Sequence, residues 1–481
     1  MKTHIIVLGF ILPFCTTLNS ISTDILQSFT IFDEPVKKYI VSVDLNISNL
    51  EWNQHKNWLI DVFNETSGMT ISSILEKSGL DSKLLQSIPI SDSIIEQSIK
   101  LFRGILGSYE LDQFKGYHGE FPTWCIQLLQ KLKFIKIVEE DQRVTFLQTL
   151  SQSSSKSFQK FENTKLQVNP AWNLDRISHR GTGFEGRYIY PSESGKDVDI
   201  YILDTGVNID HENFSGRAKF GTSFSTDGPT DVNGHGTHVA GVAASTTYGV
   251  AKDANIIAVK VLNDDGFGTT SSVMDGISWA IQNAGTTGRR SVINLSLGGG
   301  KESTALNQLV TAGVAKGIAF AVAAGNARSD ACKGSPQNLN VVMTVAASNE
   351  YDEIANFSNY GKCVSIFAPG TNITSTSHLN NIGTRTLSGT SQSSPHVAGL
   401  MAIIMGIYPD IQPMTVYNTI LQTATEGKLN KLGIKDPNKL LFNGIPSPEL
   451  TGGSGNRVGN DFSFQGGGWT LVKQMVFSSF L

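Results

Sequence analysis

Between residues 198 and 346, continuous apolar runs of strand length alternate with stretches that have helical spacing. A strand that is apolar on both faces must be covered on both sides, which is typical of a parallel sheet between layers of helices. In such sheets, functional groups gather at the carboxyl ends of the strands. We therefore expect an α/β domain with strands at 198–203, 256–262, 292–297, 318–324 and 341–346, and with helices at 237–244, 271–283 and 304–316.

The first expected strand ends in an aspartate that is followed by a turn, Asp204-Thr205-Gly206. Alone, this tripeptide is a weak signal, because an acidic residue often ends a strand without a catalytic role. Aspartic proteases also carry Asp-Thr-Gly, but they need two copies and this chain has one. Asp204 is therefore a candidate only if chemical partners for it exist elsewhere.

A more specific pattern is the run Asn233-Gly-His-Gly-Thr-His238, which leads into a helix of small residues. Glycines on both sides would leave one edge of the His235 imidazole exposed. His235 and His238 also have the i, i+3 spacing of a metal pair, but a zinc protease would carry His-Glu-x-x-His, which is absent. We expect His235 to be the functional histidine and His238 to be packed and hydrogen-bonded beneath it.

A turn of small residues, 388–391, runs straight into an apolar segment that is long enough for a buried helix. Pro395 suits the first turn of that helix, where a missing N–H is tolerated. Ser391 then lies among unpaired backbone N–H groups at the positive end of the helix dipole. There a serine can attack a carbonyl while its own N–H holds the oxyanion, or it can simply cap a core helix.

Asn326 follows the strand expected at 318–324. An amide side chain at a strand end can donate a hydrogen bond to a developing oxyanion. The alternative is that Asn326 only forms the turn after the strand.

The length of 481 residues predicts two or more domains, and the net charge of −4 gives no sign of a nucleic-acid or anionic membrane partner. Residues 1–20 have a short apolar core followed by small polar residues, which is typical of a secretory signal peptide. This core is too short to anchor the chain in a bilayer. We expect a secreted, extracellular protein, with a vacuole-like lumen as the alternative destination.

Residues 38–147 show the pattern of a small α+β domain, with strands at 39–43, 102–106 and 134–138 and helices at 51–63 and 124–132. The segment 72–100 is compatible with a helix but has no assigned place. Residues 148–168 are rich in Ser, Gln, Lys and Asn, which predicts a solvated linker accessible to proteases. The larger domain then spans 169–445, and 446–481 form a low-complexity tail.

The chain has four cysteines. Cys15 belongs to the signal peptide and Cys125 to the domain at 38–147. Cys332 and Cys363 remain as an even pair in an oxidising compartment, so we expect a disulfide between them.

Asp204, His235 and Ser391, in this chain order and with these flanking residues, resemble the catalytic residues of the subtilisin superfamily, in its proteinase K and cerevisin-type branch. Residues 171–180, 248–251, 294–299 and 357–361 add to the resemblance, which covers about 170–444. It implies a three-layer subtilisin-like domain with a mostly parallel central sheet, a serine endopeptidase activity and no organic cofactor.

Residues 38–145 resemble the inhibitory propeptide of this family. The segment ends in Val138-Glu139-Glu140-Asp141, whose carboxylates would be stabilised at helix N-termini of the larger domain. A solvated acidic turn is the alternative for these three residues. The linker at 148–168 would offer the bond for self-cleavage.

The resemblance implies a role for each site residue. His235 would take the proton of Ser391 Oγ and return it to the leaving amine, while Asp204 orients the imidazole. Asn326 and the Ser391 N–H would bind the oxyanion. The substrate backbone would lie as a strand between two segments, and a roomy, uncharged first pocket would take apolar or aromatic side chains. The residues assigned to the backbone are Gly266, Phe267, Gly268, Ser296, Leu297 and Gly298, and those assigned to the pocket, which would also suit plain core packing, are Ala323, Ala324, Gly325 and Gly334.

Two positions depart from the family pattern. Gln392 stands directly after the nucleophile, where the family usually has Met, and a buried amide there needs a partner. Ser365 stands where proteinase K-like enzymes carry an Asp that binds calcium. Because the charged oxygen ligand is lost, we do not predict that strong calcium site, although calcium binding as such stays open.

We expect a monomeric serine endopeptidase that is made as a zymogen, acts on proteins and peptides through an acyl-enzyme, and is inhibited by its own propeptide. A catalytically inactive homologue that only binds proteins is an alternative, but all three triad residues and Asn326 are present. A lipase-type esterase would carry Gly-x-Ser-x-Gly around Ser391, and this chain does not.

Overall fold

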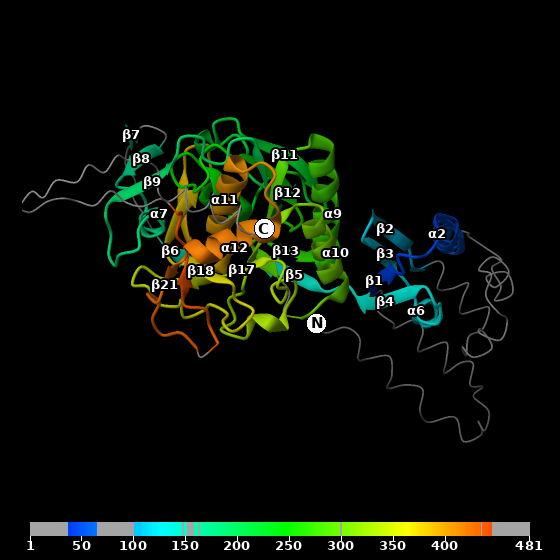
Figure 1. Cartoon of the computed structure of the whole chain (residues 1–481). Coiled ribbons are helices and arrows are strands. Elements are labelled where there is room, and N and C mark those ends of the chain that lie inside the picture. Colours follow the sequence, from blue (N-terminus) through cyan, green and yellow to red (C-terminus); the bar gives the residue numbers. More distant parts are fainter. Residues whose placement is uncertain are drawn as a thin grey trace, which may run out of the picture. The chain divides into compact units, whose positions relative to one another are not determined.

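The computed structural model describes residues 37–64, 101–146, 149–151, 158–161, 164–298, 301–433 and 435–444 (Figure 1). These residues divide into two compact units, of which the first takes in 37–39, 47–64, 101–106 and 119–133, and the second takes in 40–46, 107–118 and the described residues from 134 onward. The expected signal peptide 1–20, the segment 72–100 and the tail 446–481 lie outside the described residues.

Among its described residues, the first unit contains the helices α2 (Asn49–Asn64) and α6 (Thr123–Leu129). A capping box starts α2: the Glu51 N–H donates to Ser48 Oγ over 3.2 Å, and the Ser48 N–H donates to Glu51 Oε2 over 3.1 Å. The buried residues of α2 recur at helical spacing, which explains why this polar-looking segment forms a helix. They are Trp52, His55, Trp58, Leu59, Val62 and Phe63.

Four of the described strands pair in the order β2-β3-β1-β4. Their bounds are β1 Lys38–Val43, β2 Gly104–Leu111, β3 Phe114–Glu120 and β4 Ile135–Glu140. The strand expected at 102–106 therefore starts later and runs longer, and β3 was not predicted. Polar residues and glycines in β3, such as Lys115, Gly116 and His118, hide the apolar alternation that would have indicated a strand.

In the second unit, a largely parallel central sheet has the strand order β11-β12-β10-β14-β16-β17-β18-β22-β21 among the described residues. The pairings from β11 to β22 are parallel, and only β21 with β22 is antiparallel. The bounds are β10 Val198–Asp204, β11 Ala218–Ser223, β12 Asn255–Lys260, β14 Arg290–Leu295, β16 Ala319–Ala323, β17 Met343–Ser348, β18 Ile366–Pro369, β21 Thr425–Glu426 and β22 Lys439–Leu440.

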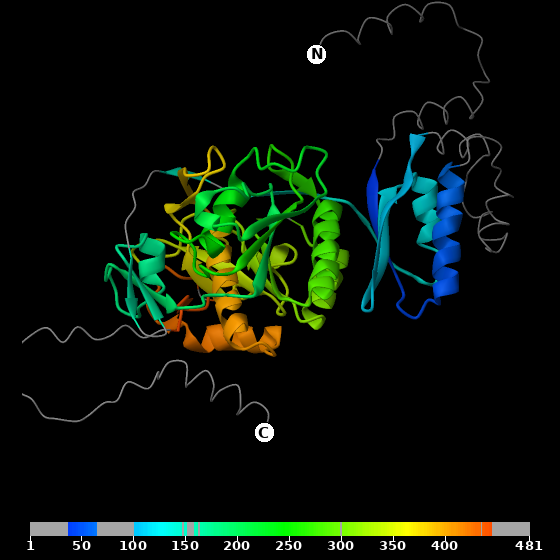
Figure 2. The same ribbon diagram turned by 90° about the horizontal axis from the view of Figure 1, so that it is seen from above.

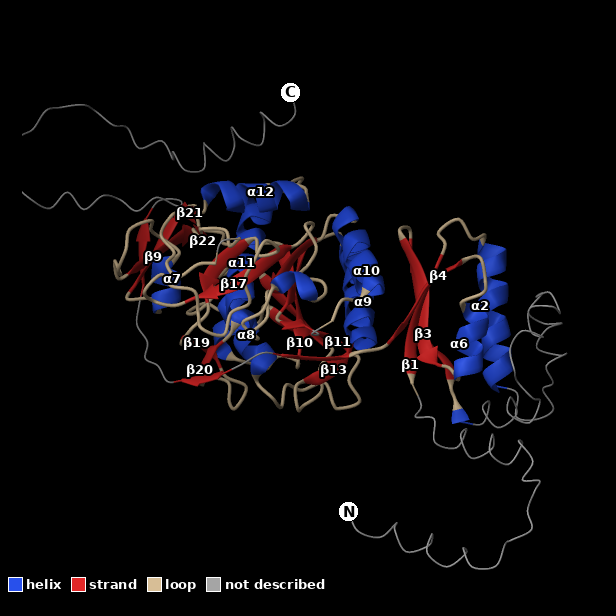
Figure 3. Ribbon diagram, turned by 90° about the horizontal axis from the view of Figure 1, so that it is seen from below, coloured by secondary structure: helices blue, strands red, loops and turns tan. Residues whose placement is uncertain are grey.

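Helices cover both faces of this sheet (Figures 2 and 3). On one face lie α8 (His235–Ala244), α11 (Thr390–Ile407) and α12 (Pro413–Thr423); on the other, α9 (Thr270–Thr287) and α10 (Thr304–Ala315) lie side by side. The side chains of β10 alternate between the two layers. Ile200 and Ile202 pack with α8 and α11, whereas Tyr201 and Leu203 pack with α9. This arrangement confirms the expected three-layer α/β domain.

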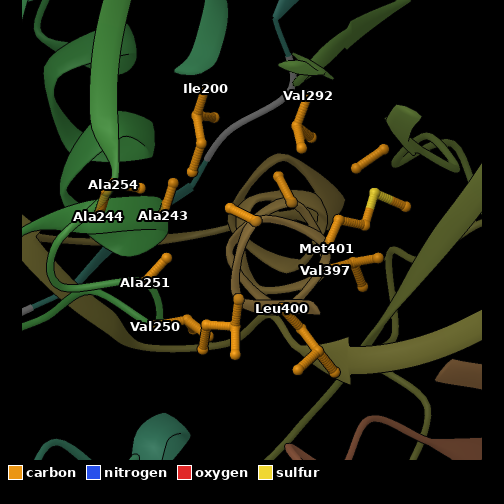
Figure 4. Close-up of a cluster of buried hydrophobic side chains, with 14 of the residues drawn as sticks. Ile200, Ala243, Ala244, Val250, Ala251, Ala254, Val292, Val397, Leu400 and Met401 are labelled. Atoms are coloured by element: carbon orange, nitrogen blue, oxygen red, sulfur yellow. The ribbon is translucent and has the colours of Figure 1, made fainter. Parts of the chain in front are cut away.

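Helix α11 lies at the centre of the hydrophobic core on the face of the sheet that α8 and α12 also cover (Figure 4). In Figure 4, α11 is seen end-on, with Ala243 and Ala244 of α8 on one side and the side chains of Val397 and Met401 pointing to the other; all of them belong to one buried cluster. Because alanines allow the two helices to approach closely, α11 is buried along nearly its whole length. Full burial of one such large apolar side chain contributes roughly 1.5–3 kcal/mol, so this packing holds the start of α11 in place.

All five expected strands and three expected helices exist, with shifted ends. Helix α9 continues beyond the expected residue 283 to Thr287, where Gly288 ends it with a positive φ of 64°. The strands β11, β18, β21 and β22 were not predicted, since they are short or carry polar residues at the sheet margin.

The expected linker at 148–168 contains three strands among its described residues, β6 (Thr149–Ser151), β7 and β8, and the expectation of a solvated segment is wrong for the last of them. Thr164–Val168 forms β8, which pairs with β7 (Phe158–Phe161) and with β9 (Arg187–Pro191). Gln167 is buried, and its Nε2 donates to Thr247 O over 3.0 Å. Apolar and polar residues alternate over only five positions there, which is too short a pattern to stand out from a polar linker.

Candidate active site

Asp204 and His235 come from different elements and meet side by side. Asp204 is the last residue of β10, and His235 is the first residue of α8. His235 Nδ1 lies 2.8 Å from Asp204 Oδ1, and both side chains are fully buried. The Thr205 N–H donates to the same Asp204 oxygen over 2.7 Å. The carboxylate therefore contacts Nδ1 of the histidine, and Nε2 lies on the opposite side of the ring.

The close approach of these two elements depends on glycine. A Cβ on Gly236 would come 2.1 Å from Gly206 O and 3.1 Å from Asp204 Cβ, so no other residue fits beside His235. Gly206 itself has a φ of +108°, a conformation that favours glycine. The glycines of the two predicted motifs thus allow the strand end and the helix start to touch.

Ser391 is the second residue of α11 and is held by Ser296 in both directions. Ser391 Oγ donates to Ser296 O over 2.8 Å, and Ser296 Oγ donates to Ser391 O over 2.8 Å. Asn294 Nδ2 in turn donates to Ser296 Oγ over 2.8 Å. The start of α11 is thereby fixed to the end of β14.

Asn326 lies beside the residue that precedes Ser391. Its Oδ1 accepts hydrogen bonds from the Thr390 N–H over 2.9 Å and from Thr390 Oγ1 over 2.8 Å. The Gly325 N–H donates to Thr390 Oγ1 over 3.0 Å. Thr390, which the sequence did not single out, therefore sets the orientation of the Asn326 amide.

His238 is a packed histidine, as expected. Its Nε2 lies 2.9 Å from Ile373 O, which belongs to β19 (Ile373–Thr376), and its side chain is fully buried. Burial lowers the pKa of His238 to about 3, so the ring is neutral. It is bound by a backbone carbonyl, not paired with His235 as a metal ligand.

The two segments expected to bind a substrate backbone already have a strand between them. Strand β5 (Arg143–Phe146) pairs antiparallel with β13 (Phe267–Thr269) on one side and with β15 (Leu297–Gly298) on the other. Thr145 Oγ1 also donates to Gly266 O over 3.0 Å. The predicted positions 266–268 and 297–298 therefore line a site shaped for one extended strand, and Ser296 lies at its end beside Ser391.

A pocket of about 110 Å³ lies next to this strand site. Three of the residues expected in the pocket line it: Ala323, Gly325 and Gly334. Gly298, which was expected to bind the substrate backbone, also lines it. Ala324 is wrong as a pocket residue, because it is fully buried in a separate core cluster with Ala346 and Phe367. The remaining lining residues are Asn326, Ala327, Ser329, Asp330, Lys333, Gln337 and Asn359.

The expectation of an uncharged pocket is therefore wrong, since Asp330 and Lys333 take part in its lining. Asn359 shapes the same wall: its Oδ1 accepts from the N–H groups of Ala327 and Ser329, both over 3.0 Å. The sequence signal for Asp330 and Lys333 was their place in the loop that follows Asn326. Only the fold of this loop turns them toward the pocket.

Gln392 keeps both ends of its side-chain amide unsatisfied. The residue is fully buried, and neither Nε2 nor Oε1 has a hydrogen-bond partner among the described residues. Its backbone carbonyl lies 2.8 Å from His396 Nδ1, and burial lowers the pKa of His396 to about 4. The structure thus supplies no compensating contact for the exchange of Met for Gln.

Cys332 and Cys363 form the expected disulfide, with their Cα atoms 5.3 Å apart. The bridge closes the loop 332–363, which carries Lys333, Gln337 and Asn359 of the pocket wall. Cys125 is a buried free cysteine.

Ser365 stands at the position where the resemblance places a calcium-binding Asp. Its hydroxyl accepts a hydrogen bond from the Thr344 N–H over 3.1 Å and offers no carboxylate oxygen. Within the described ranges, no three or more His, Cys, Asp and Glu side chains gather in a way that could hold a metal ion. The residues at this position do not fit the calcium site of the family.

Across the part of the chain that the structure describes, no helix combines the length and apolar character needed to cross a membrane.

The chain is similar to known proteins over most of its length. The subtilase family profile matches residues 195–444. The subtilisin-like serine protease Cur l 4.0101 of Cochliobolus lunatus is 35% identical over 95% of this chain and 87% of its own length. Alkaline protease 2 of Aspergillus fumigatus is 41% identical over 70% of each chain.

Among solved structures, that of a cold adapted subtilisin-like serine proteinase is 40% identical and has a TM-score of 0.54. The match covers 57% of this chain and 98% of that one. The family profile, the relatives that cover most of the chain and the solved structure all point to the same family. The chain belongs to the subtilase family and is a subtilisin-like serine endopeptidase.

Proposed function

We propose that Asp204, His235 and Ser391 hydrolyse peptide bonds as a catalytic triad. Ser391 Oγ attacks the substrate carbonyl carbon and its proton passes to His235, which then gives the proton to the leaving amine. Water next attacks the acyl-enzyme, again with His235 as the base, and releases the acid product. The 2.8 Å contact between Asp204 and His235 Nδ1 supports this, because it orients the ring and stabilises its charged form.

Asn326 and the Ser391 N–H are proposed to bind the oxyanion. The Asn326 oxygen is occupied by Thr390, so the NH₂ end of the amide is the end that can donate to a substrate oxygen. The Ser391 N–H lies in the first turn of α11, where backbone donors have no partner within the helix. Two such donors stabilise the charge that develops in the transition state.

The single observation that carries the zymogen proposal is the position of β5. Its residues belong to the propeptide segment 38–147, yet they pair with both β13 and β15 as an extended substrate would. The chain continues as β6 (Thr149–Ser151), which pairs antiparallel with β20 (Thr384–Ser388). The precursor thus occupies its own substrate site on both sides of Ser391.

The two registers define the bond that we propose is cleaved. Phe146 pairs with Leu297 and Thr149 pairs with Ser388, so only residues 147 and 148 lie between the two pairings. Ser391 Oγ is bonded to Ser296 O, and Ser296 would be the next residue opposite the chain after Leu297. We therefore assign the processed bond to Leu147–Gln148, at the boundary between the expected propeptide 38–147 and the expected linker 148–168.

Carboxylates of the propeptide support its role as an inhibitor. Glu139 accepts hydrogen bonds from Ser303 Oγ and, over 3.1 Å, from the Thr304 N–H at the start of α10. Asp141 accepts from the N–H and the hydroxyl of Ser271 in the first turn of α9. Carboxylates are stabilised at helix N-termini, so Glu139 and Asp141 cap helices as hypothesised, whereas Glu140 is exposed.

For substrates, we propose proteins and peptides with broad specificity that leans toward apolar and aromatic side chains next to the cleaved bond, since Gly298, Ala323 and Gly325 leave room in the pocket. Secretion through residues 1–20 and a monomeric state remain predictions.

The experiment is to express the full precursor and follow its processing by mass spectrometry. A new N-terminus at Gln148 and release of an active peptidase are expected. Purified fragment 38–147 should then inhibit hydrolysis of a small peptide by the mature enzyme, and the inhibition should fade as the fragment is digested. Processing only at a distant bond, or no inhibition at micromolar fragment, would contradict the zymogen proposal.

A further inference from the structure

The turn that carries Asp204 and the helix start that carries His235 are joined by a buried carboxylate outside the triad. We infer that Asp231 is a positioning residue that holds these two catalytic groups in register. The inference rests on the proposed function of Asp204 and His235. In this role Asp231 does not contact the substrate.

All four hydrogen bonds of the Asp231 carboxylate come from these two elements. Oδ1 accepts from Thr205 Oγ1 and from the Gly234 N–H, both over 2.8 Å. Oδ2 accepts from the Thr237 N–H over 2.8 Å and from Thr237 Oγ1 over 2.5 Å. The residue is only 2% exposed, so its negative charge depends on these donors and on the N-terminus of α8.

The donors are immediate neighbours of the catalytic residues. Thr205 follows Asp204 and donates its N–H to Asp204 Oδ1 over 2.7 Å. Gly234 precedes His235, and Thr237 follows it by two residues. Asp231 thus closes a second connection between the two catalytic side chains, in addition to their direct contact.

Thr205 is the shared element of this connection. Its hydroxyl donates to Asp231 and also accepts from the Gly236 N–H over 3.0 Å, which reaches the residue after His235. On the other side, the buried Lys260 donates from Nζ to Thr205 O over 2.7 Å. The turn is therefore held between a carboxylate and an ammonium group, which leaves it little freedom to rotate.

The turn at Gly206 and the turn at Asp231 are packed closely against each other. A Cβ on Gly206 would lie 3.2 Å from both Cα and N of Asp231, so the two turns are already in contact. Replacing Asp231 by Asn would put an NH₂ group against donors that need an acceptor. We expect the turns to separate slightly and the Asp204–His235 geometry to loosen, which affects the transition state more than substrate binding.

The test compares Asp231→Asn with a matched control, Asp175→Asn, in the full chain after processing. Asp175 is also buried and accepts from two backbone N–H groups, those of Glu185 and Gly186, without touching Asp204, His235 or Ser391 in any described hydrogen bond. A fluorophosphonate label counts active sites, and thermal unfolding reports stability. We expect Asp231→Asn to lower kcat about 10- to 100-fold with KM within about 3-fold. Asp175→Asn should keep kcat even if its unfolding midpoint falls.

A second pair of variants covers the case in which Asp231→Asn does not fold. Thr205→Val removes the bridging hydroxyl at constant shape and should lower kcat about tenfold, whereas Thr205→Ser should restore it. The inference is overturned if Asp231→Asn or Thr205→Val keeps kcat within about twofold, if Thr205→Ser is as slow as Thr205→Val, or if Asp175→Asn loses as much kcat. A wrong assignment of the triad would give a different result: the variant Ser391→Ala would still hydrolyse peptides.

Discussion

Ser271 binds both carboxylate oxygens of Asp141, with its N–H donating to Oδ1 over 2.9 Å and its hydroxyl donating to Oδ2 over 2.6 Å. The two residues are separated by 130 positions in the chain. Because Ser271 lies in the first turn of α9, this contact places a charge of the proposed propeptide at the positive end of a helix of the larger domain. Cleavage after residue 147 would leave this contact intact, so the propeptide would remain bound after it is cut.

The first prediction concerns this retention. Asp141→Asn and Glu139→Gln in fragment 38–147 should each weaken inhibition of the mature enzyme by roughly 5- to 30-fold, since each removes a charge-assisted contact contributing about 1–2 kcal/mol. Asp61→Asn, at an exposed position of α2, is the control and should inhibit like the unmodified fragment. Equal loss in all three variants would mean that overall charge, not capping, determines inhibition. The measurement is the inhibition constant on a small peptide substrate.

The second prediction concerns the triad. Ser391→Ala should abolish peptide hydrolysis and leave the precursor uncut at Leu147–Gln148. Asp204→Asn should lower kcat by about 10⁴, as the equivalent change does in another serine protease, because an amide in place of the carboxylate holds the His235 ring in the wrong tautomer. Asn326→Ala should cost about 10²–10³ in kcat, the size typical of removing one oxyanion donor from a subtilisin. Activity of Ser391→Ala above a small residual would contradict the assignment of the nucleophile.

The third prediction concerns the pocket wall. Gln337 Oε1 is buried without a hydrogen-bond partner among the described residues, although the side chain lines the pocket. A substrate glutamine can donate to this oxygen, so the preference of the pocket for an apolar side chain should be smaller when methionine is compared with glutamine of similar size. Gln337→Leu should lower the ratio of kcat/KM for glutamine over methionine peptides about tenfold, because the hydrogen bond is lost. An unchanged ratio would show that Gln337 does not face the substrate.

The fourth prediction concerns Gln392, whose amide is buried without partners in the described structure. Gln392→Met should raise stability by about 1–3 kcal/mol, since the desolvated amide is replaced by an apolar group of similar size. The unfolding midpoint should be measured in a Ser391→Ala background, which prevents self-digestion. Gln167→Leu, which removes a hydrogen bond to Thr247 O, is the control and should not stabilise. A fall in midpoint for Gln392→Met would point to an unseen partner of the amide.

The fifth prediction concerns the disulfide between Cys332 and Cys363, which are 31 positions apart. On the chain-entropy model, a bridge that closes a loop of this size contributes roughly 3–4 kcal/mol. Mass spectrometry of the non-reduced enzyme should show the linked peptides. The double change to Ser should lower the unfolding midpoint and, because the closed loop carries Lys333 and Gln337 of the pocket wall, should also raise KM. Free thiols in the mature enzyme would contradict the bridge.

The amino-acid sequence by itself determined the layered α/β domain and the residues that meet in its centre. Runs such as 198–203 have no polar face, so they had to be buried between helices, and glycines around His235 and Asp204 are informative because only glycine fits there. The short linear motifs around Asp204, His235 and Ser391 therefore predicted the Asp204–His235 contact correctly. The pairing of Cys332 with Cys363 followed from the number of cysteines left in the domain at 169–445.

The tertiary structure alone decided how distant segments approach one another. The burial of Ala324, the polar wall with Gln337, and the pairing of Phe146 with Leu297 depend on loops and registers that no local pattern encodes. Asp231 is the sharpest example, since its sequence neighbours give no sign that Thr205, 26 positions away, donates to it. Local propensity reports which strands and helices form, whereas the hydrogen bonds that orient a catalytic group arise only when separate elements are packed against each other.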